Sequence, residues 1–233
     1  MKDTACIAID LGATSGRVIL AKMKPGRLET EILNRFPNVI KEIDGRCYWD
    51  IYSLFDSIKE GLNMAASRRI AIDSIGVDTW GVDFAFLGSD GQMLGMPYAY
   101  RDPHTMGAPE EYFEKIMSRK EVYEATGIQV MNFNSLYQLY AMKRDKSSLL
   151  AAAKEALFIP DALSYMLTGK KVVEYTIAST SQMLNPRTKK FEKALLEKMG
   201  VDPELFGQIV MPGYVIGELT DTLAAETGLG KIP

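Results

Sequence analysis

The sequence predicts a mixed α/β domain in which helices cover a central sheet, and three features of the chain support this. Apolar runs with the length of strands occupy residues 5–9, 17–21 and 28–36, and short turns join them. We therefore expect an antiparallel meander of three strands at the start of the chain. Asp50 is then followed by apolar residues at helical spacing, and the β-branched run at residues 70–77 predicts one more strand after that helix. Three strands, a helix and another strand fit a mixed sheet flanked by helices.

Length and composition set the class of the protein. The chain has 233 residues, enough for one large α/β domain or two small ones, and 47% of them are hydrophobic, as in ordinary globular proteins. Its net charge is −3 and no run of Lys or Arg exceeds two residues, which argues against nucleic-acid binding. No apolar run approaches the length of a membrane span and no signal peptide precedes the first strand, so we expect a cytoplasmic protein without a membrane partner. Cys6 and Cys47 lie in apolar segments and are expected to be buried, reduced thiols.

The second half of the chain is predicted to be mainly helical. Helices are expected at residues 106–117 and 119–125, the latter stopped by Gly127. Ser135 and Gln138 have the spacing of a capping box at the start of a helix that runs to Arg144, and an alanine-rich helix is expected at residues 149–156. Earlier in the chain, residues 84–87 and 93–96 flank a turn and predict a hairpin.

The first polar motif follows the first strand. Asp10 ends that strand, and a small turn, Leu11-Gly12-Ala13-Thr14-Ser15-Gly16, joins it to a second strand that Arg17 leads. A buried strand that ends in a carboxylate presents it at the rim of the sheet, where a hydrated metal can bind. Glycine adopts positive φ at little cost and lets a backbone approach a phosphate, and successive N–H groups in such a turn bind anions. The motif is neither a P-loop nor a dinucleotide fingerprint, and the alternative is an ordinary hairpin with a solvated Asp10.

A second motif is Asp78-Thr79-Trp80-Gly81-Val82-Asp83-Phe84. Trp80 can stack on the apolar face of a sugar, while the carboxylates accept hydrogen bonds from its hydroxyls. Gly81 permits close approach, so that a side chain there would occupy the volume of the ligand. The alternative is a turn with a core tryptophan and two solvated acids.

The third motif is Tyr98-Ala99-Tyr100-Arg101-Asp102, followed by His104, the only histidine. Arg101 and Asp102 form either an ion pair on a loop or part of a binding site. A single histidine with no cysteine nearby does not indicate zinc, and His104 is expected to be a surface or loop residue.

These motifs, in this order, resemble those of the carbohydrate kinases related to glycerol kinase and xylulokinase. Residues 9–17 resemble the first phosphate motif of that family, and residues 78–84, 98–102, 127–129, 133–139 and 174–176 are similar to the rhamnulokinases within it. The resemblance runs from the first strand to the last residue. It implies the ribonuclease H-like ATPase fold that actin and Hsp70 share, with ATP and Mg²⁺ in a cleft between two domains. It also implies a ketose acceptor: L-rhamnulose first, with L-fuculose and L-xylulose as alternatives.

The resemblance also implies roles for single residues. Asp10 would hold the hydrated Mg²⁺, and the γ-phosphate would be lined by Ala13, Thr14, Ser15, Gly16 and Arg17. Gly81 would contact the ketose, Trp80 and Asp83 would shape its pocket, and Arg101 is a further candidate for a sugar contact. In that family the general base is an aspartate of a His-Asp-Thr motif, which is expected after Pro233. Residues 1–233 would then be the N-terminal sugar-binding domain, inactive without that base and without the C-terminal ATPase lobe.

Two other classes of function use some of the same residues. Asp10 and Asp78 on strand ends could mark a two-metal nuclease of ribonuclease H type, although the acidic balance of charge weighs against it. A non-catalytic sugar-binding or assembly module is the other alternative. Binding to a nucleic-acid duplex or hybrid at low salt distinguishes the first of these from a kinase.

Overall fold

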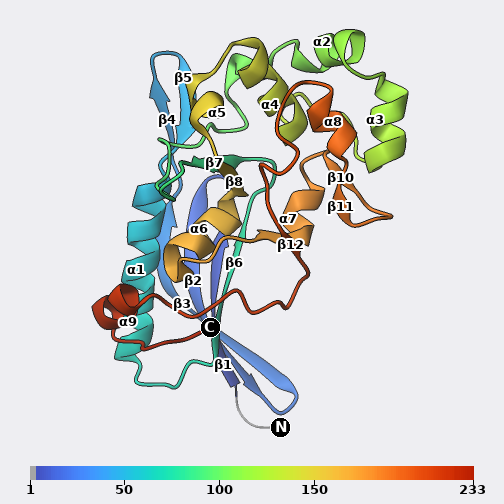
Figure 1. The fold of residues 1–233 in the computed structure, drawn as a ribbon. Helices are drawn as coiled ribbons and strands as arrows, with labels where there is room; N and C mark the ends of the chain where they lie inside the picture. Colours follow the sequence, from blue (N-terminus) through green and yellow to red (C-terminus); the bar gives the residue numbers. More distant parts are fainter. Residues whose placement is uncertain (1–3) are drawn as a thin grey trace.

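The computed structural model describes residues 4–233, and a four-stranded sheet lies at its centre (Figure 1). Its strands are β1 (Thr4–Leu11), β2 (Ser15–Lys24), β3 (Arg27–Pro37) and β6 (Ser74–Thr79), in the order β3-β2-β1-β6. Strands β1, β2 and β3 pair antiparallel, which confirms the expected meander, and β6 pairs parallel with β1. The sheet is therefore mixed, as predicted, and β6 is shorter than expected because it begins only at Ser74.

Helix α1 (Ile51–Ser67) covers one face of this sheet. Its N-cap is Asp50, as predicted, and the carboxylate accepts the N–H of Ser53 at 3.1 Å. The helix approaches β2 so closely that a Cβ at Gly61 would lie 2.4 Å from Cγ2 of Val18. Since Val18 is opposite Ile9 in β1, the buried side chains of both strands face α1. The neighbouring residue Asp10 therefore points to the other face, because side chains alternate along a strand.

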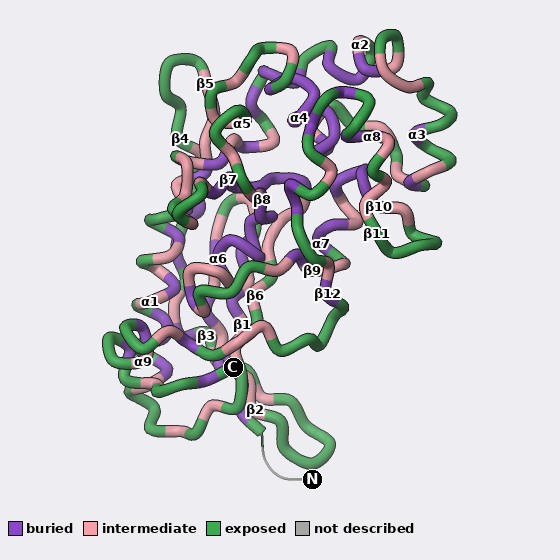
Figure 2. Tube along the Cα trace, viewed as in Figure 1, coloured by how far each residue is buried: buried purple, intermediate pink, exposed green. Residues whose placement is uncertain are grey.

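Most of the remaining elements form a second region beside the carboxyl ends of β1 and β6 (Figure 1). Its centre is α4 (Ser135–Arg144), most of which is buried (Figure 2). The other elements are β4 (Ile40–Ile43), β5 (Arg46–Trp49), β7 (Phe84–Leu87), η1 (Pro103–Thr105), α2 (Ala108–Lys115), α3 (Arg119–Thr126), α5 (Ser148–Ala152), β8 (Glu155–Phe158), α6 (Ile159–Thr168), β9 (Val173–Glu174), α7 (Tyr175–Ser179), β10 (Leu184–Asn185), β11 (Lys190–Phe191), α8 (Lys193–Glu197), β12 (Ile209–Val210) and α9 (Asp221–Thr227). Of these, α6 also packs against β6, and α9 packs against α1 (Figure 1).

The helix expected at residues 149–156 is wrong in its second half. Helix α5 ends at Ala152, and residues 155–158 form β8, which pairs antiparallel with β7. Alanine favours a helix locally, but pairing with β7 buries Ala156, Leu157 and Phe158 and overrides that preference. The hairpin expected between residues 84–87 and 93–96 is accordingly reduced to a turn with one bridge, between Leu87 and Met93.

Two further expectations concern the thiols and the membrane. Cys6 and Cys47 are free, as expected, but both are half-buried rather than buried. Burial still raises the pKa of the Cys47 thiol, and the negative charge of Asp102 raises it further. Among residues 4–233, no helix has the combination of length and apolar character that crossing a bilayer requires.

Candidate functional site

The turn between β1 and β2 presents Asp10 and Arg17 side by side. The two residues are opposite each other in the antiparallel register, and their side chains form an ion pair. About 36% of the Asp10 side chain and 43% of the Arg17 side chain is exposed, so this pair is open to an incoming ligand. The turn itself closes on a hydrogen bond from Gly12 N–H to the Ser15 carbonyl at 2.9 Å. One exposed cation and one exposed anion thus lie at the rim, where the motif predicted them.

The two glycines of this turn do not have the left-handed backbone conformation that the motif suggested. Neither Gly12 nor Gly16 has a positive φ. Gly16 is buried, and a Cβ there would lie 2.4 Å from the ring of Phe36 and 2.6 Å from Cδ2 of Leu11. Gly16 is therefore required for packing beneath the turn, whereas Gly12, Ala13, Thr14 and Ser15 form its open side.

Asp78 lies beside Asp10 in the parallel pairing of β1 and β6. Residues opposite each other in neighbouring strands point to the same face, and strands are about 4.8 Å apart. Two carboxylates thus share one patch at the carboxyl end of the sheet, which is where open α/β sheets bind ligands.

Asp83 is the centre of the second motif. Its side chain is fully buried, and its Oδ2 accepts hydrogen bonds from Trp49 Nε1 at 2.6 Å, Trp80 Nε1 at 2.9 Å and the backbone N–H of Tyr100 at 3.0 Å. Its Oδ1 accepts one from Gln138 Nε2 at 2.9 Å. Burial raises the pKa of Asp83 to about 7, while these donors act in the opposite direction and favour the carboxylate. The alternative of a solvated acid is therefore wrong for Asp83, which is a buried junction that joins four segments.

The side chains of Trp80, Tyr100 and Phe133 lie next to this junction, and we call them the aromatic wall. Trp80 is half-buried and packs on the fully buried Trp49, with ring centroids 4.1 Å apart. Tyr100 lies 6.0 Å from Trp49 and 5.7 Å from Phe133. Trp80, Tyr100 and Phe133 keep partly exposed faces, which are suited to stacking against a ring of a ligand.

The backbone between Trp80 and Asp83 is strained at Val82 rather than at Gly81. Val82 has φ = 69°, which is rare for a β-branched residue, whereas Gly81 does not have a positive φ. The Val82 N–H donates to Thr180 Oγ1 at 3.0 Å, and its carbonyl accepts from the Ser135 hydroxyl and from Gln138 Nε2. The predicted capping box is therefore wrong: Ser135 and Gln138 hold this turn, and Asn134 occupies the N-cap position of α4. Strain that is held in place by several bonds is typical of ligand sites.

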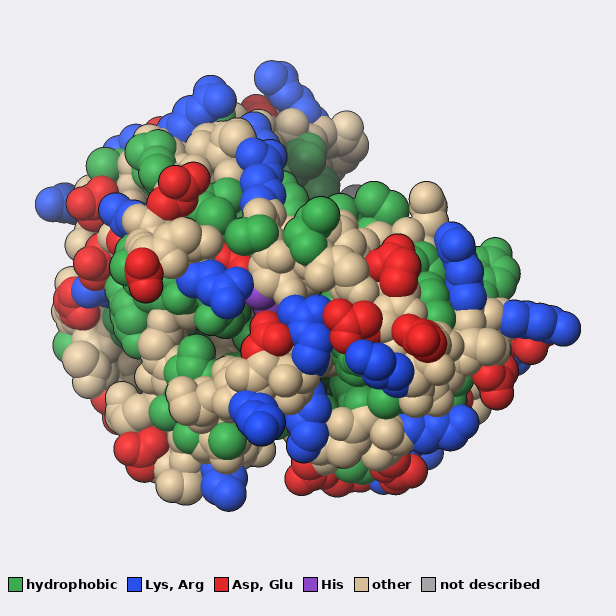
Figure 3. Space-filling model, turned by 90° about the horizontal axis from the view of Figure 1, so that it is seen from above, with side chains coloured by type: hydrophobic (Ala, Val, Ile, Leu, Met, Phe, Trp, Pro, Cys, Tyr) green, Lys and Arg blue, Asp and Glu red, His purple; other side chains and the backbone are tan. Residues whose placement is uncertain are grey.

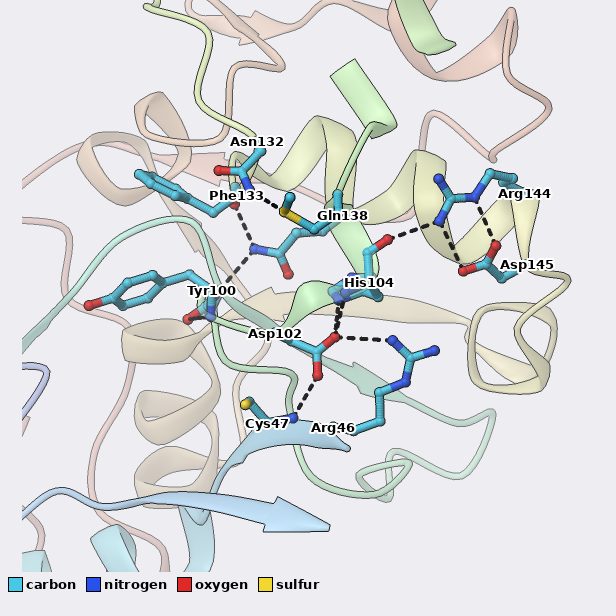
Figure 4. Close-up of polar contacts among 12 residues, drawn as sticks. Arg46, Cys47, Tyr100, Asp102, His104, Asn132, Phe133, Gln138, Arg144 and Asp145 are labelled. Atoms are coloured by element: carbon cyan, nitrogen blue, oxygen red, sulfur yellow. Dashed lines mark hydrogen bonds and ion pairs between the residues drawn. The ribbon is translucent and has the colours of Figure 1, made fainter. Parts of the chain in front are cut away.

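The ion pair considered for Arg101 and Asp102 does not form. Asp102 is buried and binds Arg46 Nη1 at 3.3 Å, Cys47 N–H at 2.6 Å and His104 Nδ1 at 2.7 Å (Figure 4). His104 is only 7% exposed, so its expected place at the surface is wrong, and burial lowers the pKa of its imidazole. Arg101 is exposed and lies over the ring of Tyr100 at 5.6 Å, so it remains beside the aromatic wall.

A groove of about 800 Å³ runs along the free edge of β6 and includes Asp78 and Gly81 in its lining. Asp161 and Glu174 also line it, and one carboxylate oxygen of each is buried without a hydrogen-bond partner among residues 4–233. Burial raises the pKa of Asp161 to about 8. Asp83, which lies behind the turn, does not line this groove.

Residues 5–233 match the model of the N-terminal domain of the FGGY family of carbohydrate kinases. The chain belongs to this family. An FGGY kinase takes a sugar and ATP as its substrates. Membership of a kinase family weighs against the nuclease considered from Asp10 and Asp78. Figure 3 agrees, since basic side chains on the face it shows alternate with acidic ones instead of forming a patch.

Several curated relatives of this chain are rhamnulokinases. That of Bacteroides thetaiotaomicron is 58% identical over 226 residues, which is 97% of this chain and 46% of that protein. That of Klebsiella pneumoniae is 42% identical over 214 residues, 91% of this chain and 44% of that protein. The chain thus spans about half the length of the curated relatives it matches.

Solved structures of FGGY kinases share the fold. Gluconate kinase from Lactobacillus acidophilus has a TM-score of 0.86 at 20% identity, over 99% of this chain and 47% of that chain. Plasmodium falciparum glycerol kinase with ADP has a TM-score of 0.81 at 12% identity, over 99% of this chain and 47% of that chain. The predicted sugar-kinase fold, with a mixed sheet and an antiparallel first meander, is confirmed.

The carboxylates at the rim fit a hydrated magnesium ion. Mg²⁺ is usually bound by one or two carboxylates, several waters and the phosphates of a nucleotide. Asp10 and Asp78 offer such a pair, and residues 4–233 contain no group of three His, Cys, Asp or Glu that could enclose a metal.

Several residues that build the site were not among the residues predicted for it. Trp49 lies in none of the motifs and Gln138 was expected to cap a helix, yet both donate hydrogen bonds to Asp83. Thr180, whose hydroxyl accepts the Val82 N–H, lies outside the motifs as well. The need of a buried Asp83 for hydrogen-bond donors was the one signal that could have identified these residues. The sequence did not show that Asp83 is buried.

Proposed function

We propose that residues 1–233 form the N-terminal, ketose-binding domain of a rhamnulokinase. The full-length enzyme would transfer the γ-phosphate of ATP to L-rhamnulose and release L-rhamnulose 1-phosphate. The observation that carries this proposal is the 58% identity to a rhamnulokinase over 97% of the chain. Reduced thiols and the use of ATP suit a cytoplasmic enzyme.

The phosphate end of the site comprises the turn and its flanking charges. In the complex, Asp10 would orient water bound to Mg²⁺, and Ala13, Thr14, Ser15, Gly16 and Arg17 would surround the γ-phosphate, with Gly16 supporting the turn from beneath. Mg²⁺, when bound, supplies neutralisation of the phosphate charge. Arg17 adds a cation next to Asp10, and because their ion pair is exposed, exchanging it for a phosphate contact costs little. Phosphoryl transfer depends mainly on such positioning and charge.

The acceptor end comprises the turn at Trp80–Asp83 and the aromatic wall. Trp80 would stack on the ketose and Arg101 would bind a hydroxyl group. Gly81 would contact the sugar through its backbone. Asp83 positions Trp80 and Tyr100 from behind rather than touching the sugar, because all four of its hydrogen bonds go to the protein.

A general base for the ketose hydroxyl is the missing part. Asp83 and Asp102, the buried acids near the wall, are bound to protein donors and are poor candidates. We propose that the base belongs to a C-terminal ATPase lobe, which would correspond to the half of the relatives that this chain does not span.

A coupled assay of ADP release tests the proposal. The full-length protein should phosphorylate L-rhamnulose faster than L-fuculose or L-xylulose at saturating MgATP, and the 233-residue chain alone should stay at background. If L-fuculose or L-xylulose is preferred, the substrate is wrong but the kinase assignment stands. Turnover by the 233-residue chain would show that the general base lies within it.

A further inference from the structure

Asn38, directly after β3, is hydrogen-bonded to the turn of residues 12–15 between β1 and β2, which we call the phosphate turn. Its backbone N–H donates to the Thr14 carbonyl at 3.0 Å, and its Nδ2 donates to the Gly12 carbonyl at 2.9 Å. The residue is 6% exposed, so both bonds are shielded from water. Asn38 therefore binds two of the three carbonyls in the segment from Gly12 to Thr14.

These two bonds determine where the amides of the turn point. In a trans peptide the C=O and the following N–H are coplanar and point in opposite directions. With the carbonyls of Gly12 and Thr14 directed at Asn38, the N–H groups of Ala13 and Ser15 are directed away from it. That is the side on which an anion would sit, since successive N–H groups form the concavity that binds phosphate.

We propose that Asn38 is a positioning residue for phosphoryl transfer: it holds the turn so that the Ala13 and Ser15 amides face the γ-phosphate. This inference rests on the proposed kinase function. Asn38 does not touch the phosphate, because the turn lies between them.

The chemistry of the side chain supports this role over simple packing. The Oδ1 of Asn38 is buried and has no hydrogen-bond partner among residues 4–233. An amide with one end paired and the other unpaired adds little to net stability. What it supplies is a donor to Gly12, which neither an aspartate nor an alanine can supply.

The test compares Asn38 with Asn34, a matched residue in β3. Asn34 Nδ2 also donates to a backbone carbonyl at 2.9 Å, that of Ser57 in α1, away from the turn. In the full-length protein, Asn38→Ala and Asn38→Asp should each lower kcat/KM for MgATP at least tenfold and leave calorimetric ketose affinity within twofold. Asn34→Ala should leave both quantities unchanged. Two Asn38 variants are used so that the test remains valid if one of them does not fold.

Hydrogen–deuterium exchange of the 233-residue chain gives a readout that does not depend on activity. The Gly12 amide is bound to Ser15 within the turn, so it should exchange faster in Asn38→Ala and at the normal rate in Asn34→Ala. An unchanged Gly12 amide, or Asn38 variants with normal MgATP kinetics in an active enzyme, would overturn the inference. A wild-type protein that phosphorylates no ketose would refute the proposed function instead, and MgATP binding by calorimetry would then decide the role of Asn38.

Discussion

Replacing Gly81 by alanine should destabilise the chain, because the new methyl group would collide with Thr180. A Cβ at residue 81 would lie 2.8 Å from Thr180 Oγ1 and 2.9 Å from both its Cβ and its Cγ2. Thr180 cannot turn away freely, since its hydroxyl accepts the Val82 N–H and donates to the Ile177 carbonyl at 2.7 Å. The sequence suggested that a side chain here would enter the sugar volume, but the structure directs it into the protein.

The size of the effect follows from this overlap. Overpacking a filled site costs about 1–3 kcal/mol. In a chain of this length about 1 kcal/mol corresponds to about 2–4 °C, so the melting temperature of Gly81→Ala should fall by about 2–12 °C. Thr180→Ala removes two of the three close atoms. The double variant should therefore lose less stability than the two single variants together.

Calorimetric melting of the 233-residue chain measures the four members of this cycle, and the ketose KM of the full-length Gly81→Ala protein complements it. If the melting temperature stays within about 1 °C while the ketose KM rises strongly, the Cβ of residue 81 faces the ligand and the argument from Thr180 is refuted. If the two single variants prove additive, the collision is not the cause of the lost stability.

Three further predictions concern carboxylates. Asp83→Asn should destabilise the chain by about 4 kcal/mol, because the four charge-assisted hydrogen bonds that Asp83 accepts are each weakened or lost at about 1 kcal/mol; urea unfolding measures this, and an unchanged midpoint would contradict it. The pKa of Asp161 rises from 3.8 to about 8 on folding, so the folded chain holds a proton that the unfolded chain has released, and stability should fall as the pH rises from about 4 to about 8. Melts at pH 5 and pH 8.5 should show a smaller difference for Asp161→Asn than for wild type or the exposed control Asp56→Asn, and equal differences would refute the assignment. Asp10→Asn should lower kcat of the full-length protein about a hundredfold, a loss of about 3 kcal/mol in the transition state. Its melting temperature should change little because its ion pair with Arg17 is exposed, and near-normal kcat at saturating Mg²⁺ would make Asp10 a structural residue.

Local patterns in the sequence were sufficient for the central sheet. Alternating apolar residues and short turns define β1, β2 and β3, and Asp50 caps α1 through a bond to Ser53, three residues away. The rim position of Asp10 follows from the same pattern, because a carboxylate that ends a buried strand emerges at the edge of the sheet. All of these features depend on residues that are close along the chain.

The environment of the second motif depended on tertiary structure alone. Asp83 is buried because Trp49, Trp80, Tyr100 and Gln138 converge on it, and Gln138 lies 55 residues away in the sequence. Asp102 likewise takes Arg46, 56 residues away, instead of its neighbour Arg101. From the sequence alone, a charged residue is expected to be solvated. The donors that make its burial possible come from distant segments, and no local sequence pattern identifies them. The sequence by itself thus determined the sheet and the turn between β1 and β2. Long-range packing decided the burial of the acids and the direction in which a Cβ at residue 81 would point.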